Sequence, residues 1–334
     1  MPELTVAAGL ARGLIEVAAM KGANAQALAL RADIDLAELA DQDNRIPLAK
    51  YTALMRAAKQ MCNDPAFGLH FGELNDLAEV SIVGLIGNAA ETMGEAMMQL
   101  SRYGRLVIEF DGGFDRFRAE TVNGELWTVD TRENPNAFFE LTESTMARTA
   151  VGVQRHGCGD MLKEIHVTHP EPSYRSEYDR IFQCPVVFSA RWNAFRIDPR
   201  LPAHRINAYP RYVFGILSQR ADTLLKELEN SKSMRGRVES LLMPILHKGD
   251  IGMDAIADRL ALSRQTLFRR LKAEGTTFEK VLDELRRTLA LSYLDGRKVS
   301  VNETAYLVGF SDPAAFSRAF KRWTGTSPRA FRAA

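Results

Sequence analysis

Four side chains near position 268 have the types and the spacing of a surface that contacts nucleic acid. Gln265, Phe268, Arg269 and Lys272 lie at positions i, i+3, i+4 and i+7, which places them on one face of an α-helix. A Gln amide can bind adenine, an Arg guanidinium can form two hydrogen bonds with guanine, and an aromatic ring can pack on the methyl group of thymine. A Lys on the same face can bind phosphate whatever the base sequence. The pattern therefore predicts a helix that lies against duplex DNA.

The segment that carries this face has a second copy near the C-terminus. Residues 254–278 and 302–328 share a short helix, a tight turn, a Ser suited to an N-cap, a second helix of about ten residues, and a Gly suited to ending it. This order is that of a helix-turn-helix, and it occurs twice. The matched pairs are Ala257 with Ala305, Leu262 with Phe310, Ser263 with Ser311, Leu267 with Phe316, Arg269 with Arg318, Leu271 with Phe320, Lys272 with Lys321, and Gly275 with Gly325.

The second copy explains why aromatic and basic side chains are mixed in residues 310–332. Helical spacing assigns Phe316, Phe320 and Trp323 to the core of a small domain. The opposite face presents Ala314, Ser317, Arg318 and Lys321. Only Arg318 can make a strong base contact there, so this copy is expected to contribute affinity more than selectivity. Across both copies, the residues expected to contact DNA are Arg264, Gln265, Phe268, Arg269, Lys272, Ser317, Arg318, Lys321 and Arg322.

An uninterrupted helical pattern at residues 276–295 connects the two copies. A helix of this length extends for roughly 30 Å at about 1.5 Å per residue. Duplex DNA presents the same groove on one side every ~34 Å, so such a rod can place two recognition helices in successive major grooves. The phosphate contacts are then assigned to Arg264, Lys272, Lys321 and Arg322, and the base contacts to Gln265, Phe268, Arg269 and Arg318.

Charge divides the chain into an acidic and a basic part, although its formal net charge is only +1. Residues 233–334 carry 18 Lys and Arg against 11 Asp and Glu, a net charge of +7, whereas residues 1–232 carry 25 against 31, a net charge of −6. The polar segment ENSKSMRG at 229–236 lies between two helical patterns and is predicted to be a linker. The predicted domains are residues 1–228 and 237–334.

The N-terminal part is predicted to be an α+β domain. Amphipathic helical patterns continue to about Tyr103, and strand-like runs then alternate with a helix near 136–155. The runs expected to form strands are LVIEF, DRFRAET, ELWTVDT, EIHVTH, VVFS and AFRID. The Gly pair at 112–113 is expected to be a hairpin turn. The fold class expected for the whole chain is an α+β domain followed by an all-α domain with tandem helix-turn-helices.

Titratable side chains in the N-terminal part do not form a catalytic or metal-binding pattern. His166 and His169 would point to opposite faces of a strand, and the three cysteines are widely spaced, so neither a metal nor another cofactor is expected. Glu140 and Glu143 are expected on a solvated helix face, because no nucleophile or base accompanies them. The sequence also lacks nucleotide-binding and hydrolase motifs, so an enzyme is not expected.

The start of the chain does not have the pattern of a secretion signal, because Glu3, Arg12 and Glu16 interrupt its apolar run. No uncharged apolar stretch reaches the ~20 residues needed to cross a bilayer, so no membrane partner is expected. An odd number of cysteines without paired spacing fits a reducing compartment, so the expected location is the cytoplasm.

The C-terminal part resembles the AraC/XylS family of bacterial transcription regulators. The strings that carry the resemblance are AIADRLALSRQTLFRRLKAEGTTF, RRTLALSYL and ETAYLVGFSDPAAFSRAFKRWTGTSPRAFR. The N-terminal strings DPAFGLHFGE, LIGNAAETMGEAMMQLSRYGRLV and YRSEYDRIFQCPVVFSARWNAFRID are similar to a subgroup that includes ornithine-utilisation regulators and has an arabinose-binding-like domain.

The resemblance implies double-stranded DNA and RNA polymerase as partners, an unknown small-molecule effector that acts through residues 1–228, and a homodimer as one arrangement. It also implies that the outward residues of the first recognition helix contact bases, which by position are Gln265, Phe268 and Arg269. Two alternatives stay open: a small-molecule enzyme with an accessory DNA-binding module, and a constitutive DNA-binding protein whose N-terminal domain only dimerises.

Overall fold

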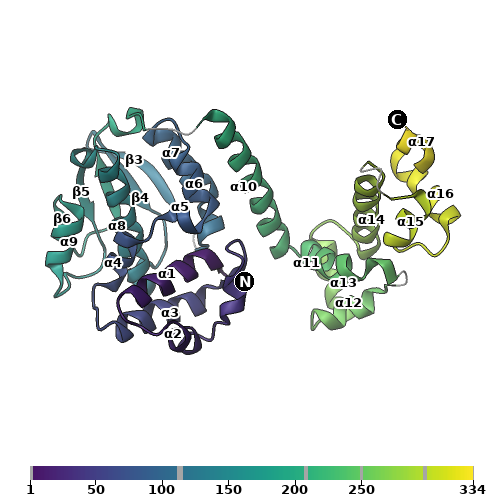
Figure 1. Cartoon of the computed structure of the whole chain (residues 1–334), viewed down its shortest axis with the longest axis horizontal. Coiled ribbons are helices and arrows are strands. Elements are labelled where there is room, and N and C mark those ends of the chain that lie inside the picture. The colour runs from purple at the N-terminus through teal and green to yellow at the C-terminus, as the bar shows by residue number, and fades with distance from the viewer. Residues whose placement is uncertain (1–2, 111–115, 207–209, 249–250, 296–298, 334) are drawn as a thin grey trace. The chain divides into compact units, whose positions relative to one another are not determined.

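The structure, a computed structural model, describes residues 3–110, 116–206, 210–248, 251–295 and 299–333. The chain folds into two compact units, Met1–Leu225 (unit 1) and Lys226–Ala334 (unit 2). Unit 1 combines helices with a five-stranded sheet, and the described residues of unit 2 form helices and turns (Figure 1). The predicted fold class is confirmed. Among the described helices, none is long and apolar enough to cross a membrane.

The first part of unit 1 is mostly helical, which agrees with its amphipathic patterns. Its helices are α1 Ala8–Met20, α2 Ala25–Arg31, α3 Leu48–Met61, α4 Phe67–Leu74, α5 Leu77–Val80, α6 Ile82–Asn88 and α7 Met93–Val107. Strand β1 (Thr5–Ala7) pairs antiparallel with β2 (Arg45–Pro47). Because β1 leads directly into α1 and β2 into α3, this pairing holds the starts of the two helices side by side.

The run LVIEF at 106–110, expected to be a strand, does not form one, and its first two residues are the end of α7. Leu106 and Val107 follow Tyr103 at i+3 and i+4, and all three are buried, so the apolar stripe of the helix continues through them. Ile108 then forms an isolated bridge with Val6. The hairpin turn expected at 112–113 lies outside the described residues.

The sheet of unit 1 has the strand order β3-β4-β7-β5-β6. Strands β3 (Phe117–Val122) and β4 (Glu125–Asp130) form an antiparallel hairpin, and their turn residues, Asn123 and Gly124, have φ angles of 54° and 78°. Two positive φ angles are what a tight hairpin turn requires. The remaining strands are β5 Leu162–His166, β6 Val186–Val187 and β7 Ala194–Ile197. All five strands correspond to predicted runs.

Helices α8 (Phe139–Arg155) and α9 (Arg175–Phe182) pack against this sheet through a shared apolar core (Figure 1). The core side chains of α8 are Met146, Ala147, Ala150 and Val153, and those of the strands include Leu162, Ile165, Phe195 and Ile197. These residues recur every three or four positions on α8 and every two on β7, as the predicted periods require. On β5, Leu162 and Ile165 are three positions apart because the pairing with β7 is irregular between Leu162 and Glu164.

Glu140 and Glu143 of α8 are buried, which corrects the expectation of a solvated helix face. Their exposed fractions are 4% and 1%. Helix α4 crosses α8 closely at this point, because a Cβ at Gly68 would lie 2.5 Å from Glu143 Oε2 and 3.2 Å from the Glu140 carbonyl oxygen. The side of α8 that carries these two glutamates is therefore covered by α4. The spacing of apolar residues along α8 does not reveal this second layer.

The segment 229–236, expected to be a polar linker, is helical on both sides of one residue. Helix α10 spans Arg211–Lys232, and α11 spans Met234–Leu242. The Ser233 hydroxyl between them accepts a hydrogen bond from the Gly236 N–H at 2.9 Å and donates one to the Asn230 carbonyl at 2.8 Å. Most of these polar residue types are compatible with an α-helix, so their polarity did not make α10 end before residue 229.

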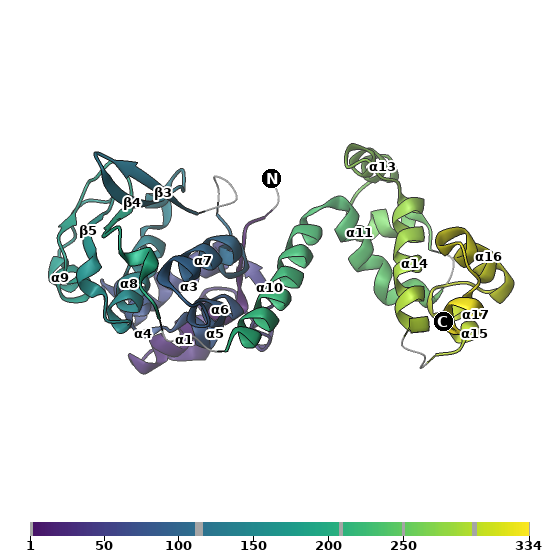
Figure 2. The same ribbon diagram turned by 90° about the horizontal axis from the view of Figure 1, so that it is seen from above.

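Unit 2 contains both predicted helix-turn-helices. Its further helices are the 3-10 helix η5 Met243–Lys248, then α12 Met253–Arg259, α13 Arg264–Ala273, α14 Phe278–Asp295, α15 Val301–Leu307, α16 Pro313–Thr324 and α17 Pro328–Ala333. The predicted core residues Ala257, Leu267, Leu271, Ala305, Phe316 and Phe320 are buried, and Leu262, Phe310 and Trp323 pack half-buried against them. Figure 2 shows α14 between α13 and α16.

Candidate nucleic-acid interface

The first recognition helix, α13, is held by a capping residue and two buried leucines. The Ser263 hydroxyl accepts a hydrogen bond from the Thr266 N–H at 3.2 Å, which confirms its predicted role as the N-cap. Leu267 and Leu271, one turn apart, are completely buried. Because this face is fixed in the core of unit 2, the orientation of the other faces of α13 is fixed as well.

The four residues predicted to form the outward face of α13, Gln265, Phe268, Arg269 and Lys272, are all exposed. The Phe268 ring is 49% exposed, and Lys272 Nζ lies 6.0 Å from its centroid. Arg269 has no carboxylate within 4.0 Å in the part of the chain that the structure describes. Its guanidinium is therefore available to an external acceptor.

Arg264, the first residue of α13, already has a carboxylate partner. Its Nη1 lies 2.5 Å from Asp254 Oδ2 on α12. Both side chains are largely exposed, and exposed ion pairs of this kind contribute little to stability. If Arg264 leaves Asp254 to bind a phosphate group instead, the lost ion pair therefore costs little free energy.

The second recognition helix, α16, begins one residue later than its pairing with α13 predicts. The carboxylate of Asp312, rather than the hydroxyl of Ser311, caps it, accepting hydrogen bonds from the N–H groups of Ala314 and Ala315 at 2.9 and 3.0 Å. Pro313 then takes the first helical position, where the missing N–H is not needed. Gly325 ends α16 with a φ of 80°, as predicted for a C-terminal glycine.

The outward face of α16 offers fewer free donors than that of α13. The Ser317 hydroxyl donates to the Pro313 carbonyl of its own helix at 2.9 Å. Arg318 Nη2 lies 3.8 Å from Asp312 Oδ2, and both side chains are exposed. Lys321 is exposed, with no carboxylate within 4.0 Å among the described residues. Arg318 and Lys321 are thus the groups of this face best placed for an external partner.

Asp283 and Arg286 of α14, which sequence reasoning did not identify, shape the second helix-turn-helix. Asp283 Oδ2 accepts hydrogen bonds from Arg322 at 2.7 Å and from Trp323 Nε1 at 3.4 Å, so Arg322 is paired rather than free. Arg286 donates to the carbonyls of Val308 and Gly309 at 3.1 and 3.3 Å, where α15 ends. These bonds satisfy carbonyl groups that a helix C-terminus leaves unpaired.

The sequence signal for this role of Arg286 is its place among buried leucines of α14, where an arginine needs polar partners. Its neighbour Leu285 belongs to the buried core of unit 2, and Leu289 packs half-buried against that core. Its guanidinium also lies 4.9 Å from the centroid of the Phe310 ring, the side chain predicted to fill the second turn. Arg286 thus supports the turn that positions α16.

A hollow of about 820 Å³ beside α14 brings parts of both helix-turn-helices together. Arg264 of α13 and Trp323 of α16 line it with three basic residues of α14 that the predicted interface did not include, namely Lys280, Arg286 and Arg287. Its acidic lining residues are Glu279, Asp283 and Glu284. Because both signs of charge are present, this surface is not a simple extension of the basic faces.

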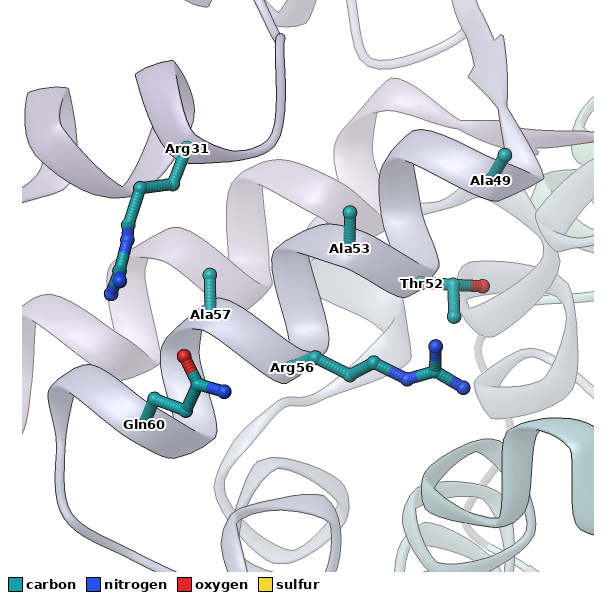
Figure 3. A pocket seen from close by; sticks show the side chains of 7 residues that line it. All are labelled: Arg31, Ala49, Thr52, Ala53, Arg56, Ala57 and Gln60. Carbon is teal, nitrogen blue, oxygen red and sulfur yellow. The ribbon is translucent and has the colours of Figure 1, made fainter.

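A second hollow, of about 550 Å³, lies on unit 1 between α2 and α3 (Figure 3). Three small side chains, Ala49, Ala53 and Ala57, form a row along α3, and Arg31 of α2 lies across from it. Arg56 at its edge donates a hydrogen bond to the Ala137 carbonyl at 3.0 Å. Arg31, Arg56 and Gln60 are exposed, and the half-buried Thr52 hydroxyl donates to the Leu48 carbonyl at 3.0 Å, so no group around the hollow requires a ligand.

The two histidines considered as metal ligands have protein partners. His166 Nε2 lies 2.5 Å from Glu164 Oε1, and His169 lies 2.9 Å from both the Tyr178 hydroxyl and the Pro170 carbonyl. Within the described ranges, no group of three or more His, Cys, Asp or Glu side chains is placed to hold a metal ion.

Comparison with known proteins gives matches to both units. A family model described as the arabinose-binding domain of AraC transcription regulator, N-terminal, matches residues 22–206, and a helix-turn-helix domain model matches residues 256–334. The ornithine utilization regulator of Pseudomonas aeruginosa is 27% identical over 330 residues, which cover 97% of this chain and 95% of that protein.

Two further relatives are named as transcription regulators. The HTH-type transcriptional regulator VirS of Mycobacterium tuberculosis is 24% identical over 304 residues, covering 87% of this chain and 86% of VirS. The HTH-type transcriptional activator RhaS of Escherichia coli is 38% identical over 119 residues, which cover 35% of this chain and 42% of RhaS.

Proposed function

Because this chain belongs to the AraC family of transcription regulators and binds DNA, we propose that it places α13 and α16 in two successive major grooves of the duplex. The observation that carries the proposal is the pair of capped helices in unit 2, each with one face in the core and the opposite face exposed. Helix α14 connects the two motifs and has 18 residues, which is about 27 Å at ~1.5 Å per residue. This length is compatible with the ~34 Å repeat of the groove.

Within this arrangement, α13 reads bases. Its Arg269 is exposed and has no carboxylate near it among the described residues, so it can form two hydrogen bonds with a guanine. Gln265 and Phe268 lie on the same exposed face and suit adenine and the methyl group of thymine. Lys272 then binds the adjacent phosphate.

Helix α16 contributes mainly affinity. Arg318 is its one side chain suited to reading a base with two hydrogen bonds, Lys321 binds phosphate, and the Ser317 hydroxyl is already used within the helix. Arg264 and Arg322 exchange their carboxylate partners for phosphates when DNA binds. The two halves of an operator should therefore differ in information content.

We further propose that unit 1 senses a small molecule and that residues 229–236, around Ser233, transmit its response to unit 2. The matching family model is described as arabinose-binding, and the Pseudomonas relative is named for ornithine utilization, so proteins similar to this chain are linked to small metabolites. RNA polymerase and a second copy of the chain are the protein partners of this proposal, and the cytoplasm is its compartment. Because the relatives are regulators, unit 1 is taken to bind its ligand without turnover; consumption of the ligand by the purified protein would contradict this.

The test is chemical footprinting of the full-length protein on an operator selected from random DNA. Wild type should protect two major-groove segments about ten base pairs apart on one side of the duplex. The variant Arg269→Ala should lose protection of guanine in one segment only. The matched control Ser317→Ala should still protect both segments. Protection of a single groove by wild type would overturn the tandem arrangement.

A further inference from the structure

Strand β3 leaves one edge of the sheet of unit 1 open. The strand lies at the end of the sheet, next to β4 alone (Figure 2), and no bridge joins its other side to any residue in the described ranges. Arg118, Ala119 and Thr121 of this strand are exposed. An open edge offers unpaired backbone N–H and C=O groups to a further strand. The outer edge of β3 is therefore accessible to a strand of another chain.

A backbone hydrogen bond at the start of β3 shows which of its residues face outward. The Arg116 carbonyl accepts from the Thr131 N–H at 2.8 Å, so residue 116 bonds to the segment that continues β4. In an antiparallel pair, the residues of one strand alternate between those that bond to the neighbour and those that do not. The N–H and C=O groups of Phe117, Ala119 and Thr121 therefore point away from β4, toward the open edge.

Two copies of β3 can pair antiparallel about a two-fold axis, which makes the same surface meet itself. An axis between two residues would set outward groups against inward ones, so the axis passes through a residue, and near the middle of the strand if most of it is to pair. An axis at Arg118 puts this arginine opposite its own copy, and an axis at Glu120 does the same to the glutamate. An axis at Ala119 places each Arg118 opposite the partner's Glu120.

Charge selects the register centred on Ala119. Arg118 and Glu120 lie two residues apart and share one face of the sheet, where Arg118 Nε lies 2.9 Å from Glu120 Oε1. Opposite charges that face each other across two strands stabilise the pair, and like charges destabilise it. Only the axis at Ala119 gives opposite charges at both positions. Charges that commonly keep an edge strand from pairing thus permit one arrangement of two identical strands.

We infer that the outer edge of β3 binds the same edge of a second copy of the chain, antiparallel and centred on Ala119. The inference rests on the proposed function, in which a second copy is a partner, and it names the surface that the two copies share. A short strand edge buries less than the ~800 Å² per partner of a stable interface. The dimer is therefore expected to be weak and to depend on concentration.

The test is sedimentation equilibrium of the full-length protein without DNA, at low ionic strength so that the charge pairs are not screened. Wild type should pass from one chain to two as its concentration rises. Arg118→Glu turns both opposite-charge pairs into Glu–Glu pairs and should raise the dimer dissociation constant about tenfold or more. Glu120→Arg should do the same through Arg–Arg pairs. The double variant restores opposite charges and should dimerise as wild type does.

A mixture of the two single variants separates pairing from any effect on the fold. At a concentration where neither variant dimerises alone, the mixed chains place Glu opposite Arg at both positions of the register. The mixture should therefore form a heterodimer. Damage to the fold of either variant would not be repaired by mixing, so this recovery reports the contact between the two strands.

Ala119→Pro tests the backbone part of the contact. It removes the N–H at the centre of the pairing and should abolish the dimer. Proline is accepted on an edge strand where the N–H faces solvent, so the thermal midpoint of the monomer should not fall. A lower midpoint would mean that this N–H bonds within the chain, which would overturn the open edge. The matched control Ala119→Val keeps the N–H, suits a strand and should dimerise as wild type does.

The two ways in which the inference can fail are distinct. If wild type stays monomeric at every concentration, the edge does not bind a second copy, and the proposed pairing of two chains fails with it in the absence of DNA. If wild type and all variants dimerise equally, a second copy remains a partner and β3 is not the surface that binds it. Neither result bears on the contacts of α13 and α16 with DNA, which footprinting tests separately.

Discussion

Replacement of Glu143 by Gln is expected to remove a pH-dependent loss of stability from unit 1. The Glu143 side chain is 1% exposed, and its Oε1 accepts hydrogen bonds from Tyr174 and Tyr178 at 2.8 and 2.7 Å. Its Oε2 has no hydrogen-bond partner in the described part of the chain. Burial raises the pKa of this carboxyl group to about 7, and the two tyrosine hydrogen bonds offset only part of the rise.

The sign and size of the effect follow from the two pKa values. A carboxyl group whose folded pKa is raised binds its proton more tightly in the folded state, so its full contribution to stability is present below the unfolded pKa and is lost as the pH rises through the folded pKa. The step from the ordinary value of 4.5 to about 7 corresponds to about 3 kcal/mol of unfolding free energy. Gln is neutral throughout, and its carbonyl oxygen can still accept from both tyrosines.

The quantity to measure is the unfolding free energy of Glu143→Gln minus that of wild type. The new amide N–H₂ replaces an atom without a partner and costs about 1–3 kcal/mol at every pH. The difference should nevertheless become more favourable to the variant by about 3 kcal/mol between about pH 4.5 and pH 8. A difference that stays constant over this range would refute the reasoning.

Urea unfolding in a Trp323→Phe background is a suitable assay. The chain has three tryptophans, and the other two, Trp127 and Trp192, both lie in unit 1. Glu73→Gln is the control, because the hydrogen bonds from Arg180 lower the pKa of Glu73. The ionised Glu73 therefore stabilises unit 1 at high pH, which is the opposite pH dependence to that of Glu143. This control should not reproduce the gain of Glu143→Gln as the pH rises.

Arg269→Ala should weaken binding to the selected operator by about 1–3 kcal/mol and relax preference at one base pair, whereas Lys272→Ala should weaken specific and random DNA equally and reduce the salt slope by about one; identical behaviour in both assays would contradict the division between base and phosphate contacts. Asp283→Ala should free Arg322, strengthen binding to random DNA and steepen its salt dependence by roughly one; an unchanged slope would mean that this arginine does not contact phosphate. Asp312→Ala removes the cap of α16 and should lower the unfolding free energy of unit 2 by about 1 kcal/mol, followed through tryptophan fluorescence.

The recognition helices were predictable because the information that defines them is local. In α13, the cap at Ser263 and the buried pair Leu267 and Leu271 lie within three turns of one another, and their spacing leaves one possible outward face. The start of α16 was placed one residue early, because the pairing of the two copies favoured Ser311 over Asp312. Both residue types suit an N-cap, and Pro313 decides between them.

The interior of unit 1 was less predictable, because burial there depends on layers contributed by distant segments. Glu140 and Glu143 follow a helical period, and that period does not say whether α4 or solvent covers their side of α8. The hydrogen bond from Arg116 to Thr145 of α8 likewise has no signal in the sequence spacing, since two separate elements bring these side chains together.

By itself, the sequence determined that unit 2 holds two helix-turn-helices, the apolar and polar faces of its two recognition helices, and the sign of its charge. These properties depend on residues within a few turns of one helix. Only the tertiary structure decided which basic groups are available to DNA. Arg264 and Arg322 are paired with Asp254 and Asp283 on neighbouring helices, whereas Arg269 is not paired with any described carboxylate. The reason is that an ion pair requires two side chains to meet in space, and the packing of α12 and α14 against the recognition helices brings those carboxylates into place.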